Sequence, residues 1–368
     1  MKAKKVFESM SPYKPGKQIE DVKKEFNLTK IVKLASNENP FGYSATVDQV
    51  VKEYGNHFEI YPDGYAAELR ALLSEQLAVD PDQLVFGCGS DEVIDIICRT
   101  YLDAGANTIM ATPTFPQYKH NALIQGAEIK EIPLIDGYHD LDGMLDAIDQ
   151  QTKVVWLCSP NNPTGCLINK QSLQSFIDRC PEHVLVVIDQ AYYEYITDED
   201  APDLIAFMNQ YPNVIVLRTF SKAYGLAGLR IGYGVASLAV SQALNIARGP
   251  FNTTLLAQKA AISALNDKAF LMHSVTETVK NRAKLMAFCD QHDLDYYDSE
   301  TNFLFIKLPV SGDAIFEYLL TKGFIVRSGE ALGHPNGVRI TIGDHEDMNE
   351  LQDHIEAFLT EHVGAGSK

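Results

Sequence analysis

The chain has 368 residues, of which 46% are hydrophobic, so it is long enough to form two packed lobes with a substantial core. Its formal net charge of -18 argues against a general affinity for nucleic acid or anionic membranes, because the mean field of the protein repels both. The sequence has no apolar run of signal-peptide or membrane-span type, and its six cysteines include no C-x-x-C pair, so we expect a cytoplasmic protein with reduced thiols and no metal site.

Residues 80 to 235 alternate short apolar runs with amphipathic runs, which is typical of an α/β core. Five apolar runs predict strands of a mostly parallel, helix-covered sheet: Gln83–Phe86, Thr108–Ala111, Val154–Cys158, Val184–Ile188 and Val214–Leu217. Between these runs, Asp91–Asp103 and Lys170–Cys180 have helical spacing, with Ser90 and Asn169 as predicted N-caps.

Beyond about residue 255 the pattern changes to helices with a few strands. We predict one long helical stretch over Leu255–Gln291, followed by four shorter elements at Phe303–Leu308, Gly312–Lys322, Val338–Ile342 and Met348–His362. The predicted architecture is a large α/β domain over residues 35–255, an N-terminal arm over 1–34, and a smaller α+β domain over 256–368 that includes the connecting helix.

The strongest local signal is the sequence TFSKAYGLAGLR, which follows the predicted strand Val214–Leu217. Its lysine, Lys222, lies close in sequence to the hydroxyls of Thr219 and Ser221 and to the guanidinium of Arg230. This pattern suits a Schiff base with an aldehyde cofactor whose phosphate the neighbouring groups hold. Taken alone, the motif is better explained by an ordinary surface lysine, because most lysines are solvated.

Two other strand ends carry polar side chains that would complete such a site. Asp189 directly follows an apolar strand, where its carboxylate could pair with a protonated pyridine nitrogen. The turn Ser-Pro-Asn-Asn-Pro-Thr-Gly follows Val154–Cys158 and could aim the Asn162 amide at a phenolate oxygen. The alternatives are a strand-end aspartate that caps the next segment and an ordinary turn.

The loop Gly-Cys-Gly-Ser-Asp-Glu that ends at Glu92 joins a predicted strand to a predicted helix. Free N–H groups at such a helix start can bind a phosphate. The loop does not match a dinucleotide fingerprint, because Glu92 occupies the place of the third glycine. All four motifs lie at strand ends of one predicted sheet, and together they supply every part of a pyridoxal-phosphate site.

These motifs resemble those of the class I/II aminotransferases of fold type I, and more narrowly those of the histidinol-phosphate aminotransferase family. The resemblance covers nearly the whole chain. The lysine motif is typical of the superfamily, whereas Ser11–Lys17, Asn37–Pro40 and Pro250–Asn252 carry the narrower likeness.

The resemblance implies specific roles around pyridoxal 5'-phosphate. Lys222 would form the Schiff base and move a proton on the substrate, and Asp189 would pair with the pyridinium nitrogen. Asn162 and Tyr192 would contact the ring oxygen O3′. Phe115 would stack on the ring, at a position where the family often has tyrosine. The remaining implied cofactor contacts are Gly89, Ser90, Asp91, Thr219, Ser221 and Arg230, with Tyr61 from a second subunit, which implies a homodimer with shared active sites.

For the substrates, the resemblance assigns Arg339 to the carboxylate of glutamate or 2-oxoglutarate, where a guanidinium can bind in bidentate fashion. Tyr13, Asn162 and Arg327 would help to hold histidinol phosphate. A surface salt bridge is the alternative for Arg327. One departure is Gln190, where many relatives have glutamate after the aspartate.

The implied reaction is transamination between L-histidinol phosphate and 2-oxoglutarate in histidine biosynthesis. Transamination of aromatic amino acids and decarboxylation of threonine phosphate are the alternatives, because related enzymes share the fold and the cofactor contacts. A cofactor-binding, DNA-binding regulator would need an added domain for which we expect no room. A nicotinamide dehydrogenase would leave the lysine motif unexplained.

Overall fold

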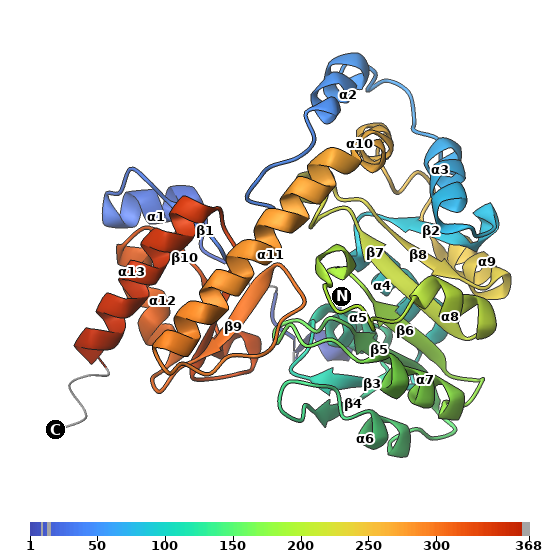
Figure 1. Cartoon of the computed structure of the whole chain (residues 1–368). Helices are drawn as coiled ribbons and strands as arrows, with labels where there is room; N and C mark the ends of the chain where they lie inside the picture. The colour runs from blue at the N-terminus through green and yellow to red at the C-terminus, as the bar shows by residue number, and fades with distance from the viewer. Residues whose placement is uncertain (9, 13–15, 363–368) are drawn as a thin grey trace.

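The computed structural model describes residues 1–8, 10–12 and 16–362, which form two lobes (Figure 1). The long helix α11 (Lys268–Gln291) runs from one lobe to the other. None of the described helices combines the length and the apolar character that crossing a bilayer requires.

The larger lobe is built on a seven-stranded sheet with the strand order β2-β8-β7-β6-β5-β3-β4. Its strands are β2 (Leu84–Gly87), β3 (Asn107–Thr112), β4 (Glu128–Pro133), β5 (Thr152–Cys158), β6 (Leu185–Asp189), β7 (Val214–Thr219) and β8 (Gly232–Ala236). All strands of this sheet run in one direction except β8, which confirms the predicted, mostly parallel α/β fold. The strands β2, β5, β6 and β7 therefore end at the same edge, where open α/β sheets bind their ligands.

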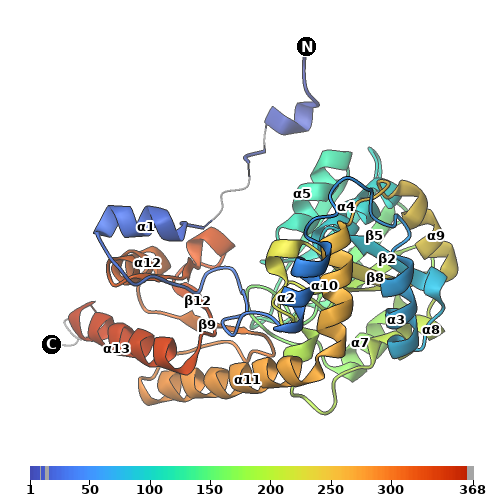
Figure 2. The ribbon, with the colours of Figure 1, turned by 90° about the horizontal axis from the view of Figure 1, so that it is seen from above.

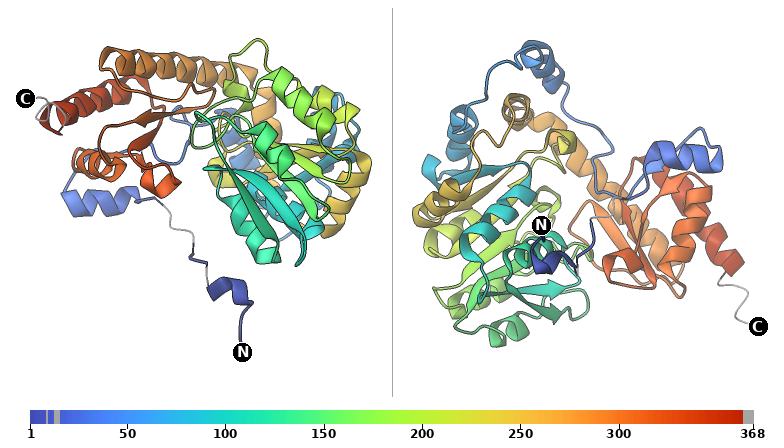
Figure 3. Two further views of the ribbon diagram at one scale, coloured as in Figure 1. Left: turned by 90° about the horizontal axis from the view of Figure 1, so that it is seen from below. Right: turned by 180° about the vertical axis from the view of Figure 1, so that it is seen from behind.

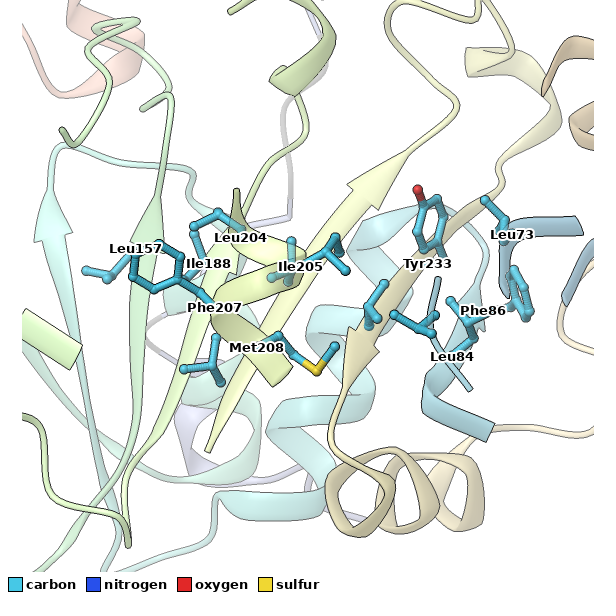
Figure 4. Packing of buried hydrophobic residues seen from close by; sticks show 14 of the residues in the cluster. Leu73, Leu84, Phe86, Leu157, Ile188, Leu204, Ile205, Phe207, Met208 and Tyr233 are labelled. Carbon is cyan, nitrogen blue, oxygen red and sulfur yellow. The ribbon is translucent and has the colours of Figure 1, made fainter. Parts of the chain in front are cut away.

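Helices cover both faces of this sheet because successive strand residues point to opposite sides. Val155 and Leu157 of β5 pack into one core cluster, whereas Val154 and Trp156 pack into the other. Figure 4 shows part of the first cluster, where Phe207 and the other labelled residues of α8 pack beside strand residues. The helices of this lobe are α2 (Thr46–Tyr54), α3 (Ala67–Leu77), α4 (Ser90–Tyr101), α5 (Gln117–Gln125), α6 (Leu141–Asp146), α7 (Lys170–Arg179), α8 (Leu204–Gln210), α9 (Leu238–Ala247) and α10 (Leu255–Asn266), with short 3-10 turns η2 (Pro81–Gln83), η3 (Tyr193–Tyr195) and η4 (Ala227–Leu229).

The smaller lobe combines C-terminal elements with a piece of the N-terminal region, and Figures 2 and 3 show the N-terminal helix α1 beside them. An antiparallel sheet has the order β11-β12-β9, and the N-terminal strand β1 pairs in parallel with β10. The elements are α1 (Ile19–Phe26), β1 (Val32–Lys33), β9 (Phe303–Lys307), α12 (Gly312–Thr321), β10 (Phe324–Ile325), β11 (Arg327–Ser328), η5 (Glu330–Leu332), β12 (Gly337–Thr341) and α13 (His345–His362), and the chain starts with the 3-10 turn η1 (Lys5–Glu8).

Two local predictions are wrong. The N-cap of α4 is Gly89, and Ser90 is already the first helical residue. The predicted long helix breaks at Asp267, whose side chain accepts a hydrogen bond from the backbone N–H of Phe270 and so caps a new helix, α11. The predicted cap Asn169 is confirmed, since its side chain accepts from the Ser172 backbone N–H.

The helix α10 packs into the core cluster that also contains residues of β5, β6 and β7. The division of the chain into domains at residue 255 stays a prediction.

Candidate active site

A cavity of about 770 Å³ opens at the edge where the parallel strands end, and residues of both lobes line it. Most of the predicted site residues lie in its wall. They are Ser90, Asp91, Phe115, Asn162, Asp189, Tyr192, Thr219, Ser221, Lys222, Arg230, Arg327 and Arg339.

Three predicted residues are not among those that line the cavity. Gly89 lies beside it as the N-cap of α4. Tyr61 lies on the outside of the lobe, 77% exposed, and its ring stacks on Phe251 with centroids 4.7 Å apart. Tyr13 lies outside the described residues.

Lys222 follows β7 by three residues, and its amine lies inside the cavity. Its Nζ donates a hydrogen bond to the carbonyl oxygen of Ser36 at 3.1 Å. The side chain is partly exposed to the cavity, but burial of the ammonium group and the positive charge of Arg339 lower the pKa of Lys222 to about 8. The amine therefore loses its proton far more readily than an ordinary lysine, which favours nucleophilic chemistry.

Asp189 ends β6 and is 3% exposed. Its carboxylate accepts from the Tyr118 hydroxyl at 2.7 Å and from the Ala191 backbone N–H at 3.0 Å. Burial raises the pKa of Asp189 to about 6, although both hydrogen bonds oppose this shift. A buried carboxylate of this kind is stabilised by any cation that enters the cavity beside it.

The start of α4 and the loop after Lys222 form a cradle whose donors suit an anion. Arg230 Nη1 donates to Ser221 Oγ at 3.2 Å, and Thr219 Oγ1 donates to Ser221 Oγ at 3.0 Å. Gly89 has a φ of +79°, and a Cβ there would lie 2.6 Å from Arg230 Nη2. The absence of a side chain at Gly89 thus lets the arginine approach the helix start, where backbone N–H groups favour negative charge.

Two arginines meet on the small-lobe side of the cavity. Arg327 on β11 and Arg339 on β12 are direct partners in the antiparallel pair. Arg339 Nη1 donates to Asn162 Oδ1 at 2.6 Å, and its Nη2 donates to the Ala35 carbonyl oxygen at 2.7 Å. Like charges opposite one another destabilise a sheet, so the pair indicates a site for an anionic ligand.

The sequence of this chain is similar to those of known proteins. The chain matches the family model of aminotransferase class I and II over residues 29–355. The chain belongs to the class I and II aminotransferase family. It is 54% identical to the histidinol-phosphate aminotransferase of Anoxybacillus flavithermus, over 98% of this chain and 100% of the relative. It is 53% identical to histidinol-phosphate aminotransferase 2 of Oceanobacillus iheyensis, over 97% of this chain and 99% of the relative.

A solved structure extends the comparison to three dimensions. The histidinol-phosphate aminotransferase of Sinorhizobium meliloti, solved in complex with pyridoxal-5'-phosphate, has a TM-score of 0.86 and 26% identity to this aminotransferase. The likeness covers 96% of this chain and 97% of that structure.

The candidate site contains contacts that sequence reasoning did not identify. Tyr118 of α5 donates to Asp189 from 71 residues away, and nothing in its local pattern distinguishes it from an ordinary core tyrosine. Asn37 belongs to a segment that carried the family resemblance, yet it received no role from the sequence. Its side-chain amide donates to the Tyr192 hydroxyl oxygen at 2.9 Å.

Gln190, the departure from the family pattern, contacts Arg218 and is not among the residues that line the cavity. Its Oε1 accepts from Arg218 Nε at 3.1 Å and from Nη2 at 2.9 Å. The same guanidinium lies 3.7 Å from the centre of the Tyr193 ring. Gln190 therefore holds the buried Arg218 side chain in place and does not itself line the cavity.

Proposed function

We propose that this aminotransferase uses pyridoxal 5'-phosphate to move an amino group between L-histidinol phosphate and 2-oxoglutarate or glutamate. The observation that carries the proposal is the placement of the Lys222 amine in one cavity with the Asp189 carboxylate and the Arg230 cradle. Relatives named as histidinol-phosphate aminotransferases, which this chain matches over nearly their whole length at more than half identity, support the choice of substrate.

The residues fit the cofactor in three respects. The cradle at the start of α4 suits a phosphate. Burial raises the pKa of Asp189, and none of the ion pairs among the described residues includes it, so this carboxylate can accept a pyridinium partner. Phe115 lines the cavity and holds an edge-to-face contact with Tyr118 at 5.6 Å, so it offers an aromatic surface to a flat ring.

Bound pyridoxal phosphate would supply an aldehyde that bonds amines and a ring that withdraws electrons from the substrate carbon. Lys222 would hold the cofactor through its Nζ and, once displaced by substrate, would move a proton at the substrate carbon. Asp189 would keep the ring nitrogen protonated. The Asn162 amide donates to the Tyr192 hydroxyl oxygen at 3.4 Å, and these two side chains would orient the ring oxygen.

The two substrates need one site that accepts a dicarboxylate and a phosphorylated imidazole alcohol in turn. Arg339, buried and held by Asn162, suits a planar carboxylate. Arg327 is half-buried in the same wall and would bind the substrate phosphate. Among the described residues Arg327 forms no ion pair with Asp or Glu, so its charge is available to a ligand.

A steady-state assay with three amino substrates tests this proposal. With 2-oxoglutarate as acceptor, we expect histidinol phosphate to give a higher kcat/KM than phenylalanine, and threonine phosphate to release no carbon dioxide. Arg327→Gln should lower kcat/KM for histidinol phosphate by about tenfold or more, because a charge-assisted contact is lost, and should leave phenylalanine nearly unaffected. A preference for phenylalanine, or carbon dioxide release, would replace the proposed substrate.

We also propose a homodimer in which Tyr61 reaches the phosphate cradle of the partner. Phe58, Ile60 and Tyr61 form an exposed run, and Phe251 stacks on Tyr61 from the same chain. Exposed apolar groups of this kind often mark an interface. We propose a cytoplasmic location as well, which is supported by six free cysteines.

A mixing experiment tests the shared site. Lys222→Ala and Tyr61→Ala proteins, unfolded and refolded together, form hybrids with one intact site if Tyr61 acts across the interface. At limiting cofactor we expect such an equal mixture to regain about a quarter of wild-type activity. Activity no higher than the average of the two separate variants would contradict a Tyr61 contribution from the partner.

A further inference from the structure

Three consecutive residues between β1 and α2 each contact a different functional side chain. In the segment 35–37, the first carbonyl oxygen accepts from Arg339 Nη2 at 2.7 Å, and the second accepts from Lys222 Nζ at 3.1 Å. The third residue, Asn37, donates from its side-chain amide to the Tyr192 hydroxyl oxygen at 2.9 Å. All three residues line the cavity, so one short segment positions an arginine, a lysine and a tyrosine.

Asn37 has an unusual backbone that is held firmly in place. Its φ is 56°, a left-handed conformation that asparagine tolerates better than most residues, and it is 1% exposed. Its backbone N–H donates to Thr341 Oγ1, whose hydroxyl donates to Asn37 Oδ1, both at 3.0 Å. The Asn302 amide donates to the Asn37 carbonyl oxygen at 3.0 Å. Thr341 lies two residues after Arg339 on β12, so the strand that carries this arginine also anchors Asn37.

The Tyr192 hydroxyl oxygen accepts two amide hydrogens, from Asn37 at 2.9 Å and from Asn162 at 3.4 Å. With both donors on the oxygen, the hydroxyl hydrogen is left to point elsewhere, and Tyr192 lines the cavity. A hydroxyl that accepts a hydrogen bond is also a stronger donor, because linked hydrogen bonds polarise one another.

We propose that Asn37 is a positioning residue for the transamination site, which fixes the direction and donor strength of the Tyr192 hydroxyl and ties it to the strand that carries Arg339. The inference rests on the proposed function, in which the Tyr192 hydroxyl contacts the cofactor oxygen. It adds a residue to which sequence analysis assigned no role.

Two substitutions separate the backbone of Asn37 from its amide. Asn37→Gly removes the amide and retains the left-handed backbone without steric strain. Asn37→Asp keeps the size of the side chain but replaces the donor with a carboxylate oxygen. Each is made in wild type and in Tyr192→Phe, and four quantities are measured: the dissociation constant of pyridoxal phosphate, the pH midpoint of the visible spectrum of the bound cofactor, kcat and KM.

In the wild-type background we expect Asn37→Gly to lower kcat by roughly tenfold with little change in KM, as for the loss of one hydrogen bond. The spectral midpoint should rise by about one pH unit, because a weaker Tyr192 donor stabilises the unprotonated cofactor less. Asn37→Asp should have at least as large an effect. In the Tyr192→Phe background the same substitutions should change kcat by less than about twofold.

Equal losses in both backgrounds, or an unchanged spectral midpoint in Asn37→Gly, would overturn the proposal and leave Asn37 with a purely structural role. The spectral titration needs no substrate. Failure of the wild-type protein to convert histidinol phosphate would therefore count against the proposed substrate and would leave the test of Asn37 intact.

Discussion

At the scale of single residues, the protonation state of Asp189 links cofactor binding to pH. Burial raises the pKa of this carboxyl group to about 6, so the cofactor-free protein carries an increasingly neutral Asp189 as the pH falls below that value. A neutral carboxyl group cannot pair with a pyridinium ion. Because the group must lose its proton for the pairing, a cofactor that pairs with Asp189 binds best above pH 6.

We predict that the dissociation constant of pyridoxal phosphate increases by up to about tenfold per pH unit below pH 6. Equilibrium titration of the cofactor-free protein between pH 5 and about 8 measures this. Asp189→Asn should bind the cofactor more weakly at every pH. Its dissociation constant should show no change of slope near the pKa of Asp189. If Asp189→Asn showed the same change of slope, the pH dependence would arise from the cofactor or from another group of the protein.

Sequence reasoning found residues whose chemistry can be read from their own neighbourhood. Asp189 and Lys222 follow apolar strands in order, and Arg230 lies in the same motif as the lysine. Tyr118 and Asn37 could not be found in this way, because each acquires its role from a partner more than 70 residues away in the chain. Such roles depend on the tertiary structure.

At the scale of elements, the start of α4 depends on a residue without a side chain. Gly89 combines a φ of +79° with an approach to Arg230 that leaves no space for a Cβ. Sequence reasoning correctly predicted a helix after this loop but placed the N-cap one residue late, because serine is the commoner cap by type. The prediction of one continuous helix across Asp267 was wrong for a related reason. An aspartate inside a helical pattern can also cap and begin a new helix, as Asp267 does for α11.

We predict that Gly89→Ala weakens the binding of pyridoxal phosphate by at least tenfold, because the new Cβ displaces Arg230 and strains the left-handed backbone. The matched control is Gly228→Ala, in the exposed turn before Arg230, where a Cβ would meet no atom within 4 Å. Cofactor titration of both variants provides the measurement. Equal affinity of the two variants for pyridoxal phosphate would contradict a role of Gly89 and Arg230 in binding the cofactor phosphate.

At the scale of the whole molecule, Arg282 of α11 joins the two lobes. It is 4% exposed, and its Nη1 donates to the Thr301 carbonyl oxygen at 2.8 Å and to the Tyr195 carbonyl oxygen at 3.4 Å. Its Nη2 donates to the Glu300 carboxylate at 3.3 Å. Because a cavity that both lobes line depends on their relative position, this arginine supports the site from a distance.

We predict that Arg282→Met lowers the free energy of unfolding by about 3 kcal/mol, because it leaves two buried carbonyl groups without their donor and removes the cation beside the partly buried Glu300 carboxylate. Lys280→Met on the same helix is the control. Lys280 forms an exposed pair with Glu277, and its loss should cost less than about 1 kcal/mol. Urea denaturation followed by circular dichroism compares them, and equal midpoints would show that Arg282 contributes no stability.

The strong negative charge of the whole molecule is not repeated at its site, where four basic side chains balance the carboxylates of Asp91, Glu92, Asp95 and Asp189. The chain carries a net charge of -18, yet Lys222, Arg230, Arg327 and Arg339 all line one cavity. With this net charge, the sequence implies that an anionic ligand needs a local basic pocket. It could not predict that Arg327 and Arg339 stand opposite one another, because that pairing depends on the register of β11 and β12.

The visible absorption spectrum of the purified protein supplied with pyridoxal phosphate tests the central claim most directly. We predict that wild type shows a visible band from the cofactor bound to Lys222, that histidinol phosphate removes the band, and that 2-oxoglutarate restores it. Lys222→Ala should show no such cycle. A band that is the same in Lys222→Ala, or one that histidinol phosphate leaves unchanged in wild type, would contradict the account.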